Sequence, residues 1–201
     1  MKNNLKEDID YEIQEPEEEC LYKRIASSVF EWTEEFVIAI SVIVIILSFI
    51  IRIVTVSGTS MMPNYSHNDR LVISAFQSEI NRGDVVVIVD VLDEPIIKRV
   101  IATEGQMVDI DSDTGAVYVD GKALDNTVYG VENGITHLEA PAEYHLSFPC
   151  IVPEDHIFVL GDNRKVSNDS RYVNIGMVDE RKVLGKALLN IYPFDKIGLA
   201  K

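Results

Sequence analysis

The longest apolar run of the chain extends from Phe36 to Val56 and is interrupted by Ser41, Ser48, Arg52 and Thr55. Its 21 residues, at about 1.5 Å each, match the roughly 30 Å hydrocarbon core of a bilayer. A cleaved signal peptide would begin with a short basic segment and have an apolar core of about 7 to 15 residues, whereas 35 residues precede this run. We therefore predict one uncleaved transmembrane helix at 36–56, with Arg52 near one interface.

Beyond residue 57 the pattern changes to short β-branched runs separated by turn residues. These runs lie at 70–75, 85–89, 96–102, 107–111, 116–120, 157–160 and 184–192. Their number and spacing predict an all-β, barrel-like domain of antiparallel sheets over 57–201, and Asp120-Gly121 indicates a tight hairpin turn. Residues 123–150 have weaker periodicity and several Gly and Pro residues, so we expect an insertion carried on the sheet there.

Residues 1–35 are predicted to be a tail and a juxtamembrane segment. Residues 1–19 hold eight acidic side chains against Lys2 and Lys6, and such a segment forms no apolar face. Lys23 and Arg24 precede the predicted span and Arg52 follows it, so the positive-inside rule places the tail in the cytoplasm. We therefore expect a single-pass protein of the cell membrane whose β domain lies outside the cytoplasm.

Composition excludes some functions. A formal net charge of −15 argues against nucleic-acid binding, which needs a basic surface. Cys20 and Cys150 lie on opposite sides of the predicted span, so they cannot pair within one chain of this topology. Neither cysteine has the spacing of a metal or redox site.

One segment is similar to a calcium loop but lacks two of its required residues. Asp109, Asp111, Asp113 and Asp120 stand at the first, third, fifth and twelfth positions. Thr114 replaces the required Gly, and the twelfth position lacks Glu. We interpret these residues as flanking a hairpin turn, and we predict no metal site and no cofactor.

A serine and a lysine stand in settings that suggest nucleophilic catalysis. Ser60 lies in a turn-forming segment directly after the predicted span, and Lys98 lies in the β-branched run 96–102. Burial lowers the pKa of an amine, and a neutral amine can take the proton of a serine hydroxyl. Taken alone, such a serine is more often a turn residue, and such a lysine is more often an exposed partner of a salt bridge.

A Ser-His-Asp triad is the alternative, because triads cannot be recognised from spacing. The chain has four histidines, at His67, His137, His145 and His156. None of them stands in a recognisable triad context, so Lys98 is the stronger candidate for the base.

A third segment, the polar block 161–171 that follows an apolar run, completes a pattern. In this order, the Ser60, Lys98 and 161–171 segments resemble those of type I signal peptidases, membrane-anchored Ser-Lys endopeptidases that remove signal peptides from exported proteins. The resemblance covers roughly residues 36 to 196 and implies a small inserted subdomain at about 123–150. It implies that Ser60 is the nucleophile, that Lys98 is the general base and that the reaction passes through an acyl-enzyme without a cofactor.

The resemblance also assigns supporting roles within the third segment. Ser167 matches the family hydroxyl that hydrogen-bonds and orients the catalytic amine. Asp169 and Arg171 match an ion pair that holds the loop in place. Asp162 and Asn163 are expected to support the turn.

The oxyanion and substrate residues follow from the same comparison. Ser60 N–H is the expected first oxyanion donor. Some family members use a second serine two residues earlier, where this chain has Gly58, so we expect a backbone donor there, with Thr59 as a weaker substitute. Met61 and Ile97 are expected to line shallow pockets for small residues at the first and third positions before the cut.

The chain departs from the family pattern at three places. Asn64 stands where the family usually has Thr, residues 102–106 match the usual Gly-Leu-Pro-Gly-Asp loosely, and residues 172–176 vary the segment after Arg171. These differences bear on loop geometry and substrate fit, while the nucleophile and the base are both present.

The expected partners are the signal peptides of exported preproteins and the lipid bilayer, with the secretion translocon nearby. A non-enzymatic membrane adaptor and a self-cleaving Ser-Lys protein are the alternatives. The adaptor predicts loss of Ser60 or Lys98, and the self-cleaving repressor needs a DNA-binding helical unit in place of the span.

Overall fold

The computed structural model describes residues 17–75, 79–139 and 141–200. The chain divides after Leu47 into two units, and the second begins at Ser48. The predicted tail lies largely in residues 1–16, outside the described residues.

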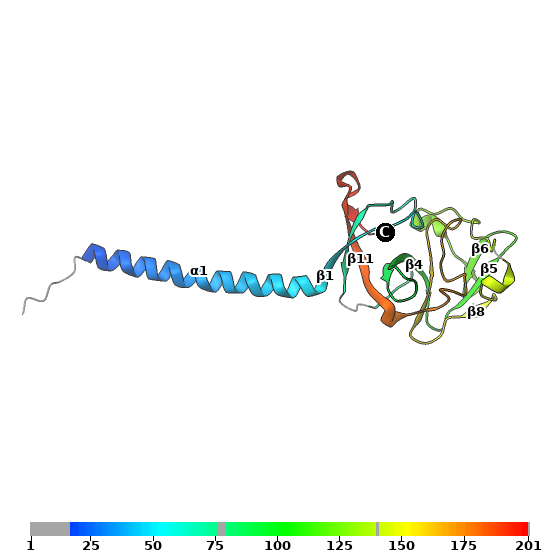
Figure 1. Ribbon diagram of the computed structural model, residues 1–201, viewed down its shortest axis with the longest axis horizontal. Coiled ribbons are helices and arrows are strands. Elements are labelled where there is room, and N and C mark those ends of the chain that lie inside the picture. Colours follow the sequence, from blue (N-terminus) through cyan, green and yellow to red (C-terminus); the bar gives the residue numbers. More distant parts are fainter. Residues whose placement is uncertain (1–16, 76–78, 140, 201) are drawn as a thin grey trace, which may run out of the picture. The chain divides into compact units, whose positions relative to one another are not determined.

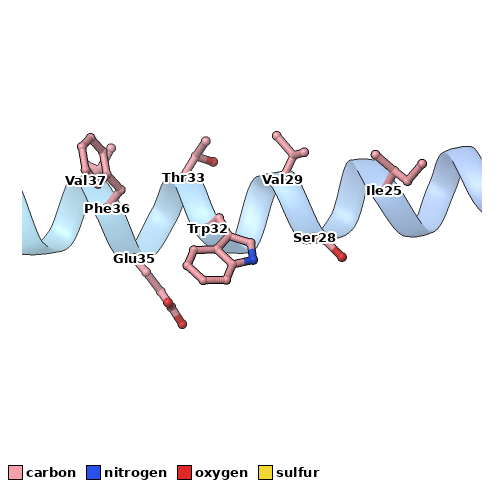
Figure 2. A pocket seen from close by; sticks show the side chains of 8 residues that line it. All are labelled: Ile25, Ser28, Val29, Trp32, Thr33, Glu35, Phe36 and Val37. Atoms are coloured by element: carbon pink, nitrogen blue, oxygen red, sulfur yellow. The ribbon is translucent and has the colours of Figure 1, made fainter.

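A single helix, α1 (Glu17–Ile50), dominates the first unit. Its apolar side chains are exposed, with 67% of Phe36 and 57% of Ile45 accessible. Figure 2 shows part of this surface, where Val29, Trp32 and Phe36 extend outward from one helix. The shallow concavity there is the relief between neighbouring side chains of one helix. By length and hydropathy, no helix in the described part of the chain qualifies as a membrane span.

The predicted helix was wrong at its C-terminal end. The helix stops at Ile50, and the next residues form strand β1 (Ile51–Thr55). This strand pairs antiparallel with β2 (Arg70–Ser74), with Ile51 opposite Ser74 and Thr55 opposite Arg70. The segment consists mostly of β-branched residues, which favour a strand. An apolar run alone cannot distinguish a strand from a continuing helix.

The second unit contains a large antiparallel sheet with the strand order β1-β2-β11-β3-β4-β9-β10, and β12 pairs with β11. After β1, its strands are β2 (Arg70–Ser74), β3 (Val85–Ile88), β4 (Ile96–Thr103), β9 (His156–Leu160), β10 (Val178–Asp179), β11 (Val183–Tyr192) and β12 (Gly198–Leu199). The predicted runs at 70–75, 85–89, 96–102, 157–160 and 184–192 are therefore confirmed as strands.

A smaller sheet has the order β7-β6-β5-β8 and lies at the end of this unit away from β1 (Figure 1). Its strands are β5 (Met107–Asp111), β6 (Ala116–Val119), β7 (Lys122–Ala123) and β8 (Cys150–Ile151). The hairpin predicted at Asp120-Gly121 joins β6 to β7, and both residues have positive φ, 52° and 74°. The segment 123–150 runs between β7 and β8 and contains two short 3-10 helices, η1 (Asn126–Tyr129) and η2 (Ala142–Tyr144).

Apolar clusters hold the two sheets and the loop between β1 and β2 together. Ile101, Phe158 and Leu160 of the large sheet pack with side chains of the small sheet in one cluster. In another, Met61 and Tyr65 pack against side chains of β2, β3 and β11. The all-β domain expected from the sequence is thus confirmed, with two sheets joined by a shared core.

Candidate active site

Ser60 lies in a loop between β1 and β2 whose backbone is fixed on both sides. Val56 N–H donates to the Asp69 carbonyl at 2.8 Å, and Asn68 N–H donates to the Val56 carbonyl at 2.9 Å. Met61, directly after Ser60, is 1% exposed and anchors the loop in the core. The partly exposed Ser60 hydroxyl is therefore held by its buried neighbours.

Lys98 comes from the middle of β4, and its Nζ lies 3.1 Å from Ser60 Oγ. The residue is 3% exposed, and its amine also donates to the Ile97 carbonyl at 3.1 Å. Burial lowers the pKa of Lys98 below its usual value of 10.5, against an opposing effect of the carboxylates of Asp169 and Asp162. The fold thus brings together the serine and the lysine predicted from sequence, with the amine in a setting that favours its neutral form.

The segment after β9 holds the loop that carries Ser60 through hydrogen bonds to that loop's backbone carbonyls. Asn163 N–H donates to the Ser60 carbonyl at 2.9 Å, and Asn163 Nδ2 donates to the Thr59 carbonyl at 3.2 Å. Gly161 leaves room for this approach, since a Cβ there would lie 2.6 Å from the Ser60 carbonyl oxygen and 2.1 Å from Ser167 Oγ. The third sequence segment therefore packs directly on the first.

Asp162 forms a fully buried ion pair with Arg99, the residue after Lys98. The Arg99 guanidinium donates to both Asp162 oxygens at 2.7 Å, and both side chains are 0% exposed. Asn64 Nδ2 donates to the same carboxylate at 2.7 Å and to the Tyr129 carbonyl. Asp162 thus joins β4, the loop that carries Ser60 and the third segment, and Asn64, a departure from the family pattern, contributes to this junction.

Asp169 and Arg171 form a second buried ion pair, at 2.8 Å. Asp169 Oδ2 accepts from Gly161 N–H at 3.1 Å, and Arg171 donates to the carbonyls of Ser167 and Arg164. These contacts fix the loop between Gly161 and Arg171.

Arg164 is a site residue that the sequence analysis did not single out. It is 2% exposed and donates to the Gly161 carbonyl, to Thr136 Oγ1 and to Asn126 Oδ1. Burial lowers its pKa to about 10. Through these bonds it links the third segment to the region between β7 and β8.

Ser167 lies within this loop but does not make the expected hydrogen bond to Lys98. Its Oγ is buried and has no hydrogen-bond partner in the described part of the chain. A buried hydroxyl without a partner is unusual in proteins.

The Gly58 N–H, expected to be an oxyanion donor, bonds to another group in this structure. It donates to His67 Nδ1 at 3.2 Å, and Gly58 has a φ of +84°. Use of this N–H by an oxyanion would require the bond to His67 to break.

The Nδ1 atoms of His137 and His156 contact the backbone carbonyls of Ser112 and Glu154.

A cleft of about 940 Å³ opens beside Ser60 and Lys98. Its lining comprises Ser57, Ser60, Asp90, Val91, Leu92, Asp93, Glu94, Pro95, Ile96, Ile97, Lys98 and Asn174. Ile97 is in this lining, as expected, whereas Met61 lies in the core and is not.

Beside this cleft, among the residues that the structure describes, the first residues of β4 pair with a neighbouring strand on one edge only. β3 pairs with β4 from Ile96 to Arg99, whereas β9 pairs with it from Arg99 to Thr103. The second edge of Ile96–Lys98 therefore has no β9 partner. An extended peptide can add to such an edge through main-chain hydrogen bonds.

Comparison with known proteins identifies relatives over most of the chain. The family model described as "Signal peptidase, peptidase S26" matches residues 29–192. Signal peptidase I of Bacillus licheniformis is 33% identical over 176 residues, which are 85% of this chain and 92% of the relative. A probable signal peptidase I-2 of Synechocystis is 34% identical and covers 84% and 76%. A crystal structure of a signal peptidase I from Enterococcus faecalis, 28% identical, covers 54% of this chain and 97% of that chain with a TM-score of 0.39.

Proposed function

Since the chain belongs to the signal peptidase family, peptidase S26, we propose that it cleaves preproteins with Ser60 as nucleophile and Lys98 as general base. The family and the relatives over most of the chain make it an enzyme of the signal peptidase I class, a serine protease that cleaves signal peptides. The observation that carries the dyad is the 3.1 Å contact between the buried Lys98 amine and Ser60 Oγ.

In the proposed first step, the neutral Lys98 amine accepts the Ser60 proton while Oγ attacks the scissile carbonyl carbon. The resulting tetrahedral oxyanion is stabilised by preorganised donors, of which Ser60 N–H is the first. Collapse breaks the peptide C–N bond, and protonated Lys98 returns its proton to the leaving amine. The mature protein departs, and the signal peptide stays as an ester on Ser60.

In the proposed second step, Lys98 takes a proton from a water molecule, which attacks the ester carbonyl. The second tetrahedral intermediate collapses, and the proton returns to Ser60 Oγ. The products are the signal peptide carboxylate and the free enzyme. One lysine thus serves as base and acid in both half-reactions.

The buried groups around Lys98 act on its amine in opposite directions. Arg99 and Arg171 are each paired with a carboxylate, and Arg164 bonds only to neutral oxygens among its hydrogen-bond partners. Desolvation has the largest effect and lowers the pKa of Lys98, and the Arg171 charge acts in the same direction, whereas the carboxylates of Asp169 and Asp162 raise it. Burial is therefore what favours the neutral amine that the proposal needs.

We propose that the substrate binds as an extended strand along Ile96–Lys98. This edge of β4 lies in the cleft and leads to Lys98, so a peptide added there is brought to Ser60. Ile97 is in the lining and is the proposed wall for the small side chains before the cut.

We also propose a single-pass anchor at α1, with the N-terminus in the cytoplasm and the β domain on the other side. The support is the apolar composition of 36–50, the exposure of its side chains and the cations Lys23 and Arg24 before it. Signal peptides have apolar cores that also partition into bilayers, so enzyme and substrate would share one surface. The lipid bilayer, the preproteins and a nearby translocon are therefore the proposed partners.

The cleavage activity is tested with the purified full chain in detergent and a preprotein that carries one Ala-x-Ala site. We expect a single cut directly after the second Ala, read by mass spectrometry of both products. A preprotein that binds but stays intact would favour the adaptor alternative.

The topology is tested by adding a protease to intact cells that make the full chain. We expect digestion of residues after 57 and protection of the segment before Lys23, detected with antibodies against each end. Lysed cells, in which both ends are digested, serve as the control, and protection of the β domain in intact cells would overturn the orientation.

A further inference from the structure

The loop between β3 and β4 forms an acidic wall of the cleft. Asp90, Asp93 and Glu94 are exposed and line the same cleft as Ser60 and Lys98. Between them, Val91 and Leu92 are partly buried and pack against the core cluster that includes Val86 and Ile88. The apolar residues hold the loop in place, so the three carboxylates are presented at a fixed site beside the catalytic pair.

The charged side chains that line the cleft are acidic, apart from Lys98. Among the described residues that line the cleft, the charged groups are the three carboxylates and Lys98. Under the proposed function, Lys98 is neutral in the working enzyme, so the cleft carries three negative charges and no positive one. Clefts lined by one sign of charge attract ligands of the other sign and repel ligands of their own sign.

The position of the acidic wall defines which part of a bound peptide it meets. Glu94 precedes Lys98 by four residues along the chain and stands two residues before the start of β4. With a strand rise of about 3.3 Å per residue, this spacing corresponds to roughly 13 Å along an added strand. A peptide bound along Ile96–Lys98 with its scissile bond at Ser60 therefore passes the wall about four to six residues from that bond.

We propose that Asp90, Asp93 and Glu94 select preproteins with a positively charged side chain four to six residues from the cut and disfavour those with a negative one. This inference rests on the proposed function and concerns the specificity of the same cleft. Because the three carboxylates are exposed, water and salt partly screen their interaction with the substrate. The interaction therefore changes the relative cleavage rates of substrates without excluding any of them.

The test compares substrates that differ by one charge. The full chain is assayed with preproteins that carry Lys, Gln or Glu at the fifth residue before the cut, and with a second set changed at the fifth residue after it. We expect kcat/KM for Lys to exceed that for Glu by about tenfold in one of the two sets, and this ratio to fall when NaCl is raised from about 0.05 M to about 0.5 M. The set that responds gives the direction in which the peptide lies.

The variant Asp90→Asn/Asp93→Asn/Glu94→Gln should bring the Lys-to-Glu ratio close to one. The control Glu132→Gln/Glu143→Gln/Asp195→Asn removes three exposed charges outside the cleft and should keep the ratio. The inference is overturned if the unmodified enzyme gives a Lys-to-Glu ratio near one with both substrate sets, or if the cleft variant keeps the native ratio. In either case, cleavage of the Gln substrates leaves the proposed function intact. Failure to cleave any of the substrates would overturn both.

Discussion

Replacing Ser60 or Lys98 by Ala is expected to abolish preprotein cleavage, lowering kcat/KM by at least about 10⁴-fold. Each residue supplies one half of a unit, because the hydroxyl does not attack without the amine and the amine has no nucleophile to activate without the hydroxyl. The double variant Ser60→Ala/Lys98→Ala should be no slower than either single one. Such non-additivity, measured with the preprotein assay, distinguishes a catalytic pair from two independent contributions.

Lys165→Ala is the matched control for Lys98→Ala. Lys165 is an exposed lysine of the third segment, and we expect the rate of its variant to stay within about twofold of the native one. Thermal unfolding of each variant separates lost chemistry from lost structure. Substantial turnover by a folded Lys98→Ala protein would show that another residue acts as the base.

Arg99→Ala is expected to be the most damaging change away from the reacting atoms, destabilising the β domain by about 3–5 kcal/mol. The change leaves the Asp162 carboxylate fully buried without its charged partner. It also removes the bonds that connect β4 to the third segment, so the rate should fall together with stability. Urea unfolding in detergent measures the first effect, and the preprotein assay measures the second.

An exposed ion pair provides the comparison for Arg99. Arg181 pairs with Asp179, and its side chain is 84% exposed. Because water solvates both partners, Arg181→Ala should leave the unfolding midpoint and the rate nearly unchanged. Equal effects of the two substitutions would show that the buried pair does not hold the site together.

The strands of the β domain could be predicted because each run is short, β-branched and bounded by turn residues. The boundary at Ile50 could not, since the run 36–56 is predominantly apolar to its end and its last residues fit both a helix and a strand. The strand forms because β2 pairs with β1 over its full length. The paired residues are 15 to 23 positions apart in the sequence, so the pairing is not visible in the local pattern.

In the site, too, residues that belong to a recognisable sequence segment could be predicted, whereas contacts between residues far apart in the sequence could not. Ser60 and Lys98 could be predicted because their two segments and the block 161–171, taken in this order, resemble those of a known family, although neither residue is distinctive alone. Arg99 was overlooked although it follows Lys98, because its partner Asp162 is 63 positions away. One signal was available: neighbouring strand residues point to opposite faces, so two adjacent cations in a β-branched run would both need buried partners.

The central claim is that a neutral Lys98 amine activates Ser60, and the pH dependence of kcat/KM tests it most directly. Desolvation lowers the pKa of Lys98 below 10.5, so activity should rise with pH as the amine loses its proton and should be lost below that pKa. The native enzyme is compared with four variants in which His67, His137, His145 or His156 is replaced by Gln. We predict that all four keep the acid limb of the native profile. Disappearance of that limb together with most of the rate in any one of them would contradict the assignment of Lys98 as the base.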